Sequence, residues 1–371
     1  MATTWNLQHP PAGRLKGRVQ QLLESCDVQI DGGAPHDIQV LNQRFYARVL
    51  SQGSLGLGES YMLGWWEARD LEGFVYRLLA GRLDERVRTW SDLAAYGMAL
   101  AVNLQRRSRA FEIGRRHYDL GNDLYEHMLD PLMIYSCGYW AQAQTLPDAQ
   151  IAKLELVFGK LGLRPGERVL DVGCGWGGAL RIAADRHGVR GVGVTVSREQ
   201  ADFARRACAG LPIEIRLEDY RGLDEPFDHV YSIGMFEHVG AKNYRRFFEV
   251  VRRCLRPNGR FLLHTIGARR PSPSNDPWIE KYIFPNSHLP GQQQLVAALG
   301  GRFSIQGWQC IGAHYVPTLR EWLRRFELSW PQLRGTRDER FHRMWRFYLC
   351  SSAASFRVEK NDVWQVLLAP L

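Results

Sequence analysis

The chain lacks the sequence features of secreted, disulfide-stabilised and membrane-spanning proteins. Its seven cysteines form no Cys-x-x-Cys pair and no Cys/His array at zinc spacing, which argues against a disulfide framework and against a bound metal. The first residues (MATTWNLQHPPAG) contain no apolar core of a signal peptide. No run of 18 apolar residues predicts a bilayer-spanning helix. We therefore expect a cytoplasmic protein whose membrane contacts are peripheral.

Acidic side chains are too few to balance the basic ones. The 371 residues include 48 Lys or Arg and 39 Asp or Glu, which gives a net charge of +9. Residues 241–270 carry nine basic side chains and one acidic, residues 106–116 carry five and one, and residues 1–110 carry thirteen and eleven. Nucleic acid and an anionic membrane are both acidic partners that fit this charge. No helix-turn-helix, zinc-finger or RNP signature supports nucleic acid.

The length predicts about two domains, and the patterning divides the chain near residue 105. Residues 14–26 (RLKGRVQQLLESC) predict a basic amphipathic helix, and apolar residues over 55–80 predict packed short helices. Alternating runs over 28–40 on either side of Asp31-Gly32-Gly33 predict a β-hairpin. We therefore expect a small, mostly helical domain over 1–105 and a second domain over 106–371.

From about residue 150 the pattern becomes one of strands alternating with helices. Strands are expected in ERVLDVG, GVGVTVS, PIEIRLEDY, FDHVYSIG and GRFLLHTIG, with helices such as GALRIAADRH between them. This alternation predicts an α/β fold with a doubly wound, mainly parallel sheet. Residues 271–290 contain five prolines and three aromatic residues, which indicates a stiff loop that closes over a site.

The run VLDVGCGWGG places glycines between the first of these strands and the first helix. Gly173, Gly175 and Gly178 satisfy the dinucleotide fingerprint, but a nicotinamide site also requires an acidic residue about 20 positions further on. The second strand ends instead at Thr195-Val196-Ser197. Asp171 precedes the first glycine, and this Asp-x-Gly-x-Gly form resembles the first motif of S-adenosylmethionine-dependent methyltransferases. It favours S-adenosylmethionine as the ligand.

Polar residues after the second and third strands are candidates for contacts with that ligand. Asp219 follows the third strand, where the resemblance places the adenine. Thr195, Ser197 and Gln200 follow the second strand, but Ser197 and Gln200 also have the spacing of a helix capping box. Both roles are compatible, because a helix can begin beside a ligand.

Residues 117–140 (HYDLGNDLYEHMLDPLMIYSCGYW), together with the glycine loop, resemble cyclopropane-fatty-acyl-phospholipid synthases and the related mycolic acid methyltransferases. The strings MFEHVG, RPNGRFLLHTIG, WIEKYIFPN and HYVPTLREW extend the resemblance over nearly all of 106–371, and it continues more weakly into the first domain. That extra domain favours the phospholipid synthases over the shorter mycolic acid enzymes.

The resemblance implies that the cis double bond of a phospholipid acyl chain attacks the methyl group of S-adenosylmethionine. The resulting carbocation loses a proton and closes to a cyclopropane. The family uses bound bicarbonate as the base, at positions that correspond here to the main chain of Cys137 and Ile266 and to the side chains of Glu237, His264 and Tyr315. A sister reaction that gives a methyl- or methylene-branched chain stays open.

Taken singly, these residues have ordinary explanations. Glu237 with His238 is more typical of a polar helix start, and His264 of a hydrogen-bonded core histidine, so it is the joint match that argues for a site. For the cofactor, the resemblance points to the following residues: Tyr135, Ser136, Asp171, Gly173, Cys174, Gly175, Gly177, Gly178, Thr195, Ser197, Gln200, Asp219 and Tyr220. It also implies a homodimer on the inner face of the membrane, contacted through the N-terminal domain. The basic excess beside a lipid site then favours an anionic membrane over nucleic acid.

Overall fold

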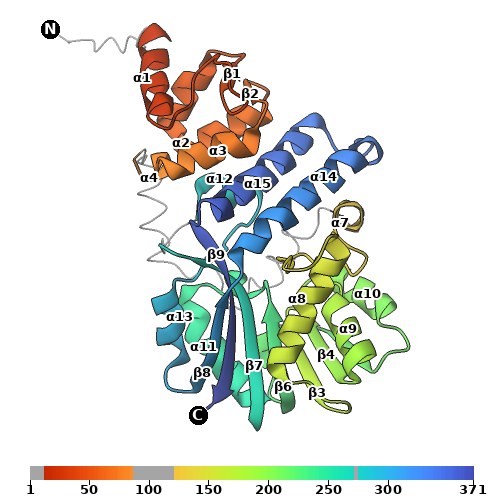
Figure 1. Ribbon diagram of the computed structural model, residues 1–371. Coiled ribbons are helices and arrows are strands. Elements are labelled where there is room, and N and C mark those ends of the chain that lie inside the picture. The colour runs from red at the N-terminus through yellow and green to blue at the C-terminus, as the bar shows by residue number, and fades with distance from the viewer. Residues whose placement is uncertain (1–11, 87–120, 271–274) are drawn as a thin grey trace, which may run out of the picture.

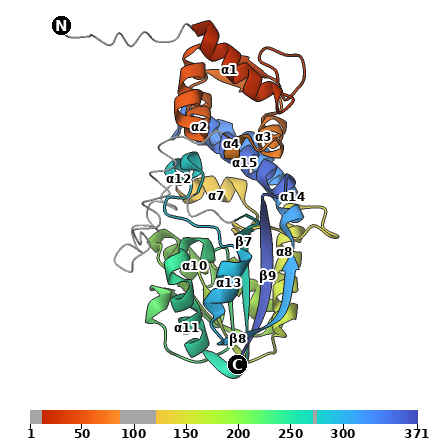
Figure 2. The same cartoon turned by 90° about the vertical axis from the view of Figure 1, so that its left-hand side faces the viewer.

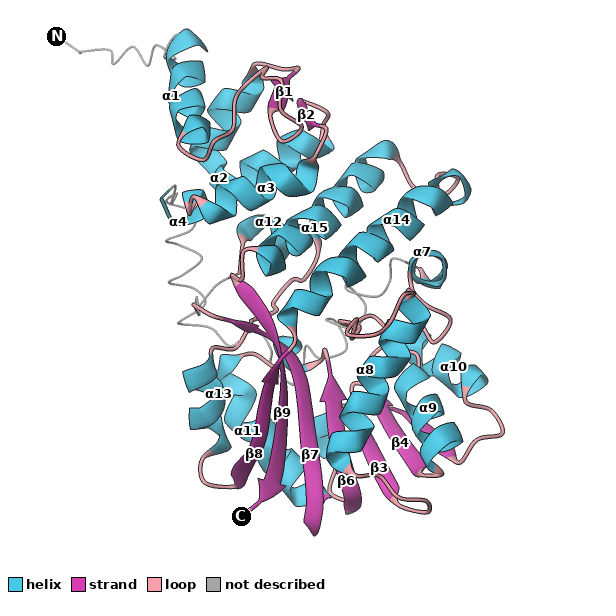
Figure 3. Ribbon diagram, in the orientation of Figure 1, coloured by secondary structure: helices cyan, strands magenta, loops and turns pink. Residues whose placement is uncertain are grey.

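The computed structural model describes residues 12–86, 121–270 and 275–371, and Figure 1 shows a helical layer stacked on an α/β layer. The predicted boundary near residue 105 and the Arg-rich segment 106–116 lie outside the described residues. Figure 3 shows that the long strands occupy the lower layer, whereas the upper layer is helical apart from two short strands.

The N-terminal layer is mostly helical, as predicted. Its elements are α1 (Ala12–Glu24), β1 (Ile38–Val40), α2 (Arg44–Met62), β2 (Trp66–Ala68), α3 (Leu71–Ala80) and α4 (Leu83–Arg86). The predicted amphipathic helix corresponds to α1, and the apolar stretch 55–80 forms the end of α2, β2 and α3. Within α2 the chain bends at Gly53, which has a φ of 56°.

The predicted hairpin over residues 28–40 is wrong. β1 pairs antiparallel with β2, on the far side of α2, while Ile30 meets Ile38 in a single parallel bridge. The reason is the buried carboxylate of Asp37, which accepts hydrogen bonds from the Gln29 and Ala34 amides, both at 2.8 Å. These bonds shape a wide loop in place of a two-residue turn.

A seven-stranded sheet forms the lower layer, in the order β5-β4-β3-β6-β7-β9-β8. The strands are β3 (Arg168–Val172), β4 (Arg190–Thr195), β5 (Ile213–Leu217), β6 (Phe227–Ile233), β7 (Leu255–Ala268), β8 (Phe303–Cys310) and β9 (Asn361–Pro370). The five predicted strands, β3 to β7, are parallel, and β9 runs antiparallel to both β7 and β8. The strand order reverses between β3 and β6, so a ligand crevice is expected at their carboxyl ends.

Helices cover both faces of the sheet because alternate residues of the strands are apolar on each side. Leu170 and Val172 of β3 pack with α11 (Tyr244–Cys254) and α13 (Gln292–Leu299). Val169, which directly precedes Leu170, faces the opposite core. Three helices complete that core: α8 (Leu146–Leu161), α9 (Gly178–His187) and α10 (Arg198–Ala207). Both faces are therefore buried, as a parallel sheet requires.

A third apolar core joins the two layers. It contains the long helices α14 (Tyr315–Leu333) and α15 (Glu339–Arg357), which lie between the sheet and the N-terminal helices, and the short α7 (Asn122–Met128). Trp66 contacts Phe74 with ring centroids 4.9 Å apart, and Tyr61 contacts Phe347 of α15 at 5.6 Å. This shared core holds the N-terminal helices above the carboxyl ends of the strands (Figure 2). Within the described ranges, no helix has the length and apolarity needed to cross a bilayer.

Candidate active site

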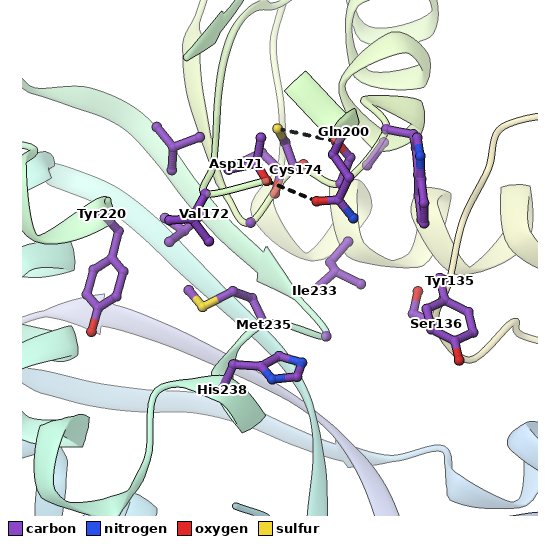
Figure 4. Close-up of a pocket in the computed structure, with 18 of the residues that line it drawn as sticks. Tyr135, Ser136, Asp171, Val172, Cys174, Gln200, Tyr220, Ile233, Met235 and His238 are labelled. Atoms are coloured by element: carbon purple, nitrogen blue, oxygen red, sulfur yellow. Dashed lines mark hydrogen bonds between the residues drawn. The ribbon is translucent and has the colours of Figure 1, made fainter. Parts of the chain in front are cut away.

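A cavity of about 170 Å³ lies where the strand order reverses, beside the amino end of α9. Most of the residues predicted to bind the cofactor line it: Tyr135, Ser136, Asp171, Gly173, Cys174, Gly175, Gly178, Thr195, Gln200, Asp219 and Tyr220. Figure 4 shows Tyr220 at one end of this cofactor cavity, and Tyr135 with Ser136 at the other.

Two predicted residues, Gly177 and Ser197, do not line the cofactor cavity. Ser197 precedes α10, and its hydroxyl accepts a hydrogen bond from the Gln200 amide at 3.3 Å, so its role here is that of a helix cap. Gly177 turns the chain into α9 with a φ of 85°.

The shape of the glycine loop explains why small residues are needed. Gly173 has a φ of 94°, which favours glycine. A Cβ atom on Gly178 would lie 2.1 Å from the Leu132 carbonyl oxygen, so no larger residue fits there. The loop therefore leaves room for a ligand against its backbone.

The acidic residues of the cavity fit an adenosyl ligand. Asp171 Oδ1 and Asp219 Oδ2 are buried and accept no hydrogen bond within the described part of the chain, although Arg221 Nη1 lies 3.5 Å from Asp219 Oδ2 as an ion pair. Buried acceptors of this kind normally have partners, and the hydroxyl and amino groups of an adenosine can supply them. Burial raises the pKa of Asp171 to about 7, while Tyr231 and Lys153 act in the opposite direction.

A second, much larger cavity of about 1790 Å³ begins beside the first one and extends up to α1. All five residues predicted for the reaction line it: Cys137, Glu237, His264, Ile266 and Tyr315. Tyr135, Ser136, Gly234 and His238 line both cavities, so the two meet there. The upper walls come from α1 to α4 and from α15, and are largely apolar. This volume exceeds the roughly 300–1,000 Å³ of ordinary ligand pockets.

The predicted closing loop forms part of the roof of this large cavity. Its helix α12 (Pro277–Tyr282) packs against α2, where a Cβ atom on Gly58 would lie 2.3 Å from the Trp278 ring. Glu59 of α2 accepts hydrogen bonds from Lys281 at 2.6 Å and from Tyr282 at 2.7 Å. The described part of the loop is thus fixed to the N-terminal helices.

Glu237 lies just after β6, in the one-turn helix η3 (Phe236–His238). Its Oε1 accepts a hydrogen bond from the Ile266 amide at 2.6 Å, and its buried Oε2 has no partner within the described residues. The Ile266 amide therefore orients Glu237. Burial raises the pKa of Glu237 to about 7, so this carboxyl can exchange a proton near neutral pH.

His264 is a neutral hydrogen-bond donor toward the same cavity. Burial and two lysines lower its pKa well below the usual range. Lys160 donates to Gln365 Oε1, which turns the amide Nε2 of Gln365 toward His264 Nδ1 at 3.3 Å. Because Nδ1 then accepts, the proton of His264 is on Nε2. Tyr315, at the start of α14, is held between Phe356 and Trp322.

The basic segment 241–270 lies mostly away from the site. Lys242, Arg269 and Arg270 line the large cavity, but its other basic residues do not. Arg256, for example, pairs with Asp228. The charge excess is therefore a weaker sign of a lipid entrance than its position in the sequence suggests.

Lys153 was missed by the sequence reasoning, although it lines the cofactor cavity. The available signal was the apolar face of α8, on which Gln150 and Lys153 are both fully buried polar residues three positions apart. Spacing of this kind puts two side chains on one side of a helix.

The raised pKa of Glu237 predicts how stability depends on pH. The pKa rises from 4.5 to about 7 on folding, so stabilisation that is present below the unfolded-state pKa is lost as the pH rises through about 7. We expect this carboxyl to lower the free energy of unfolding by on the order of 3 kcal/mol between about pH 5 and pH 8. Chemical denaturation of wild type and Glu237→Gln over this pH range measures the change in the free energy of unfolding. The variant should be the more stable protein at about pH 8. An equal loss of stability in both proteins would show that the pKa of Glu237 is not raised.

Cys137 is buried, and burial raises the pKa of its thiol, so it is not an activated nucleophile. The thiol donates to the Gly138 carbonyl at 3.2 Å, a bond that a serine hydroxyl can replace. We expect Cys137→Ser to retain more than about a third of the turnover and to lose about 1 kcal/mol of stability. Turnover and thermal unfolding of the purified variant check this. Inactivation as complete as that of a Glu237 variant would show that the thiol takes part.

The sheet order, the glycine loop after β3 and the buried carboxylates beside it define an S-adenosylmethionine-dependent methyltransferase. The family follows from comparison: a model of the mycolic acid cyclopropane synthetase family matches residues 105–366, and the chain belongs to that family. It is 47% identical over 350 residues to the cyclopropane-fatty-acyl-phospholipid synthase of Escherichia coli, covering 94% of this chain and 92% of that protein.

Further relatives include mycobacterial enzymes. Cyclopropane mycolic acid synthase 1 of Mycobacterium tuberculosis is 35% identical over 270 residues, 67% of this chain and 93% of its own length. Among solved structures, cyclopropane synthase MmaA2 from the same organism has a TM-score of 0.67 at 31% identity, covering 72% of this chain and 100% of its own. Mycolic acid cyclopropane synthase CmaA1, complexed with SAH and CTAB, has a TM-score of 0.65 at 34% identity, covering 70% and 97%. These likenesses confirm the predicted fold class and family.

Proposed function

We propose that this enzyme transfers a methylene carbon from S-adenosylmethionine to the cis double bond of a phospholipid acyl chain and so forms a cyclopropane ring. The observation that carries the proposal is the junction of the two cavities at Tyr135, Ser136, Gly234 and His238. One cavity suits an adenosyl ligand and the other suits a long apolar chain. Their junction is the place where the two reactants can meet.

The reaction requires the protein mainly to position the two reactants and to exclude water. S-adenosylmethionine supplies an electrophilic methyl group on a good leaving group, and the alkene is the nucleophile. The walls of the large cavity must align the alkene, exclude water from the carbocation and present aromatic faces to that carbocation. Tyr135, whose hydroxyl is hydrogen-bonded to that of Tyr348 at 2.8 Å, and Tyr315 lie in these walls.

A base must then take a proton from the new methyl group, and we propose bicarbonate held by the residues around Glu237. The donor set fits a small anion: His264 has its proton on Nε2, and Tyr315 contributes a hydroxyl. Oε2 of Glu237, which accepts no hydrogen bond within the described residues, can accept one from the bicarbonate hydroxyl. Bound there, bicarbonate would supply the proton acceptor. Cys137, whose main chain the resemblance assigns to this anion, lines the same cavity.

We also propose that the enzyme works as a homodimer on the anionic inner face of the membrane. The large cavity reaches Val19, Leu22 and Leu23 of α1, and the exposed side of the same helix carries Arg14 and Lys16. Basic residues near an anionic surface contribute about 1 kcal/mol each. Co-sedimentation with vesicles of anionic and of neutral phospholipid tests this placement, and equal binding to both would contradict it.

Expression in a bacterial host that makes no cyclopropane lipids tests the reaction. We expect membrane acyl chains to gain the mass of one CH₂ group and to show the high-field proton signal of a cyclopropane. Unchanged lipids, with folded protein that binds S-adenosylhomocysteine, would contradict the proposal. A gain of carbon without the ring signal would indicate the branching reaction. The 35% identity over 345 residues to tuberculostearic acid methyltransferase UfaA1 of Mycobacterium tuberculosis keeps that alternative open, below the 47% identity to the cyclopropane synthase.

A further inference from the structure

The wall of the cofactor cavity contains a fully buried ammonium group, that of Lys153 on α8. Its Nζ donates a hydrogen bond to Ser136 Oγ at 2.9 Å. One turn earlier on the same helix, the side chain of Gln150 donates to the Ser136 carbonyl oxygen at 2.8 Å. Two buried side chains of α8 thus hold a single serine.

The charge of Lys153 is poorly compensated by the protein. No carboxylate of the described residues lies within 4 Å of its Nζ, and the acidic groups that act on it from further away are Asp130 and Asp171. The Asp130 carboxylate is engaged by the Leu132 and Ile134 amides. The pKa of Asp171 is raised to about 7, so it is only partly charged at neutral pH. Buried charges are normally paired.

Lys153 nevertheless remains cationic at neutral pH. Burial lowers its pKa from 10.5 to about 8, which still leaves most of the group protonated at pH 7. A buried cation in a cavity wall without a nearby carboxylate favours an anionic group of the ligand as its counter-charge.

Ser136 is placed to connect Lys153 with such a group. Ser136 lies at the end of the cofactor cavity opposite Tyr220 (Figure 4) and also lines the large cavity, called the lipid cavity from here on. Because its oxygen accepts from Lys153, its hydroxyl proton can point to an acceptor in the cavity. The other cation of the wall, Arg221, pairs with Asp219 at 3.5 Å, near Tyr220.

We propose that Lys153 is the counter-charge of the amino-acid carboxylate of S-adenosylmethionine and acts on it through the hydroxyl of Ser136. This inference rests on the proposed function only in its choice of cofactor. The carboxylate is the one anionic group of that molecule, and the acidic residues at the Tyr220 end suit its adenosine. Lys153 is therefore a positioning residue: it holds the methionine end of the cofactor where the two cavities meet.

Two ligands separate this role from a general structural one. S-adenosylhomocysteine carries the amino-acid carboxylate, whereas 5′-methylthioadenosine shares the adenosine and the sulfur but lacks it. We expect Lys153→Met to weaken the calorimetric affinity for S-adenosylhomocysteine by about tenfold to a hundredfold, as loss of a charge-assisted hydrogen bond does. The affinity for 5′-methylthioadenosine should change by less than about twofold. Lys153→Arg should recover part of the loss.

Lys160→Met is the matched control for the affinities, because Lys160 is a partly buried lysine of the same helix that supports His264 through Gln365 and does not line the cofactor cavity. It should not change the ratio of the two affinities. If Lys153→Met fails to fold, Ser136→Ala, which removes only the hydroxyl, should shift the ratio in the same direction. An unchanged ratio in the folded variants would overturn this proposal, whereas a wild-type protein that binds neither ligand would overturn the proposed function itself.

Discussion

Replacing Glu237 with Gln is expected to lower turnover by about a hundredfold to ten-thousandfold, the range for loss of a positioned proton-transfer group. The amide keeps an oxygen for the Ile266 amide, 2.6 Å from Oε1, so the local fold should persist. It cannot take or hold a proton at the position of Oε2. The affinity for S-adenosylhomocysteine should stay within about twofold, because Glu237 lines the lipid cavity and not the cofactor cavity. Mass spectrometry of vesicle lipids and calorimetry measure the two effects.

The comparison with Glu237→Asp sharpens this experiment. Aspartate keeps the charge but shortens the reach, so it should recover some turnover if the carboxyl itself is required. Turnover of Glu237→Gln within about threefold of wild type would show that the reaction takes its base elsewhere. A parallel collapse of cofactor affinity would mean that the substitution had disrupted the whole site.

Introducing a tryptophan at Ser352 is expected to reduce turnover by roughly a hundredfold, because the indole would protrude into the large cavity and obstruct the acyl chain there. Ser352 lies one helical turn after Tyr348 on α15, and both residues line this cavity. No residue of α15 lines the cofactor cavity. The affinity for S-adenosylhomocysteine should therefore be unchanged. The acyl chain, by contrast, would be blocked between the N-terminal helices and Glu237.

Arg340→Trp provides the matched control, since this residue is exposed near the start of the same helix. It adds the same bulk outside the cavity and should retain most of the turnover. If Ser352→Trp, folded and binding the cofactor, converted phospholipid vesicles as fast as Arg340→Trp, the large cavity would not be the path of the acyl chain.

The cofactor side of the fold was predictable because its signals are local. The strands β3, β4 and β6 are short, largely buried runs followed by a polar or glycine-containing turn, and α9 follows the glycine loop directly. The carboxyl ends of parallel strands meet at one edge, so Asp171 and Asp219 had to come together there. Ser197 shows the limit of this reasoning, because a capping residue and a ligand contact give the same spacing.

Long-range pairing was not predictable in the same way. β8 and β9 lie about fifty residues apart in sequence and pair antiparallel at the edge of the sheet. β1 pairs with β2, from which α2 separates it in the sequence, and a local hairpin pattern could not show this pairing. In both cases the partner of a strand depends on packing between distant segments.

By itself, the sequence determined the parallel sheet and the glycine loop after its first strand, because each is encoded in short runs of residues, whereas the set of residues expected around Glu237 followed from the joint resemblance of several separate runs. Only the tertiary structure decided that the N-terminal helices share a core with α14 and α15, and that their apolar side continues the cavity that begins at Glu237. It also decided that Lys153 is buried behind Ser136. The physical reason is that a cavity and an uncompensated buried charge are properties of packed surfaces from many segments, and no single segment carries them.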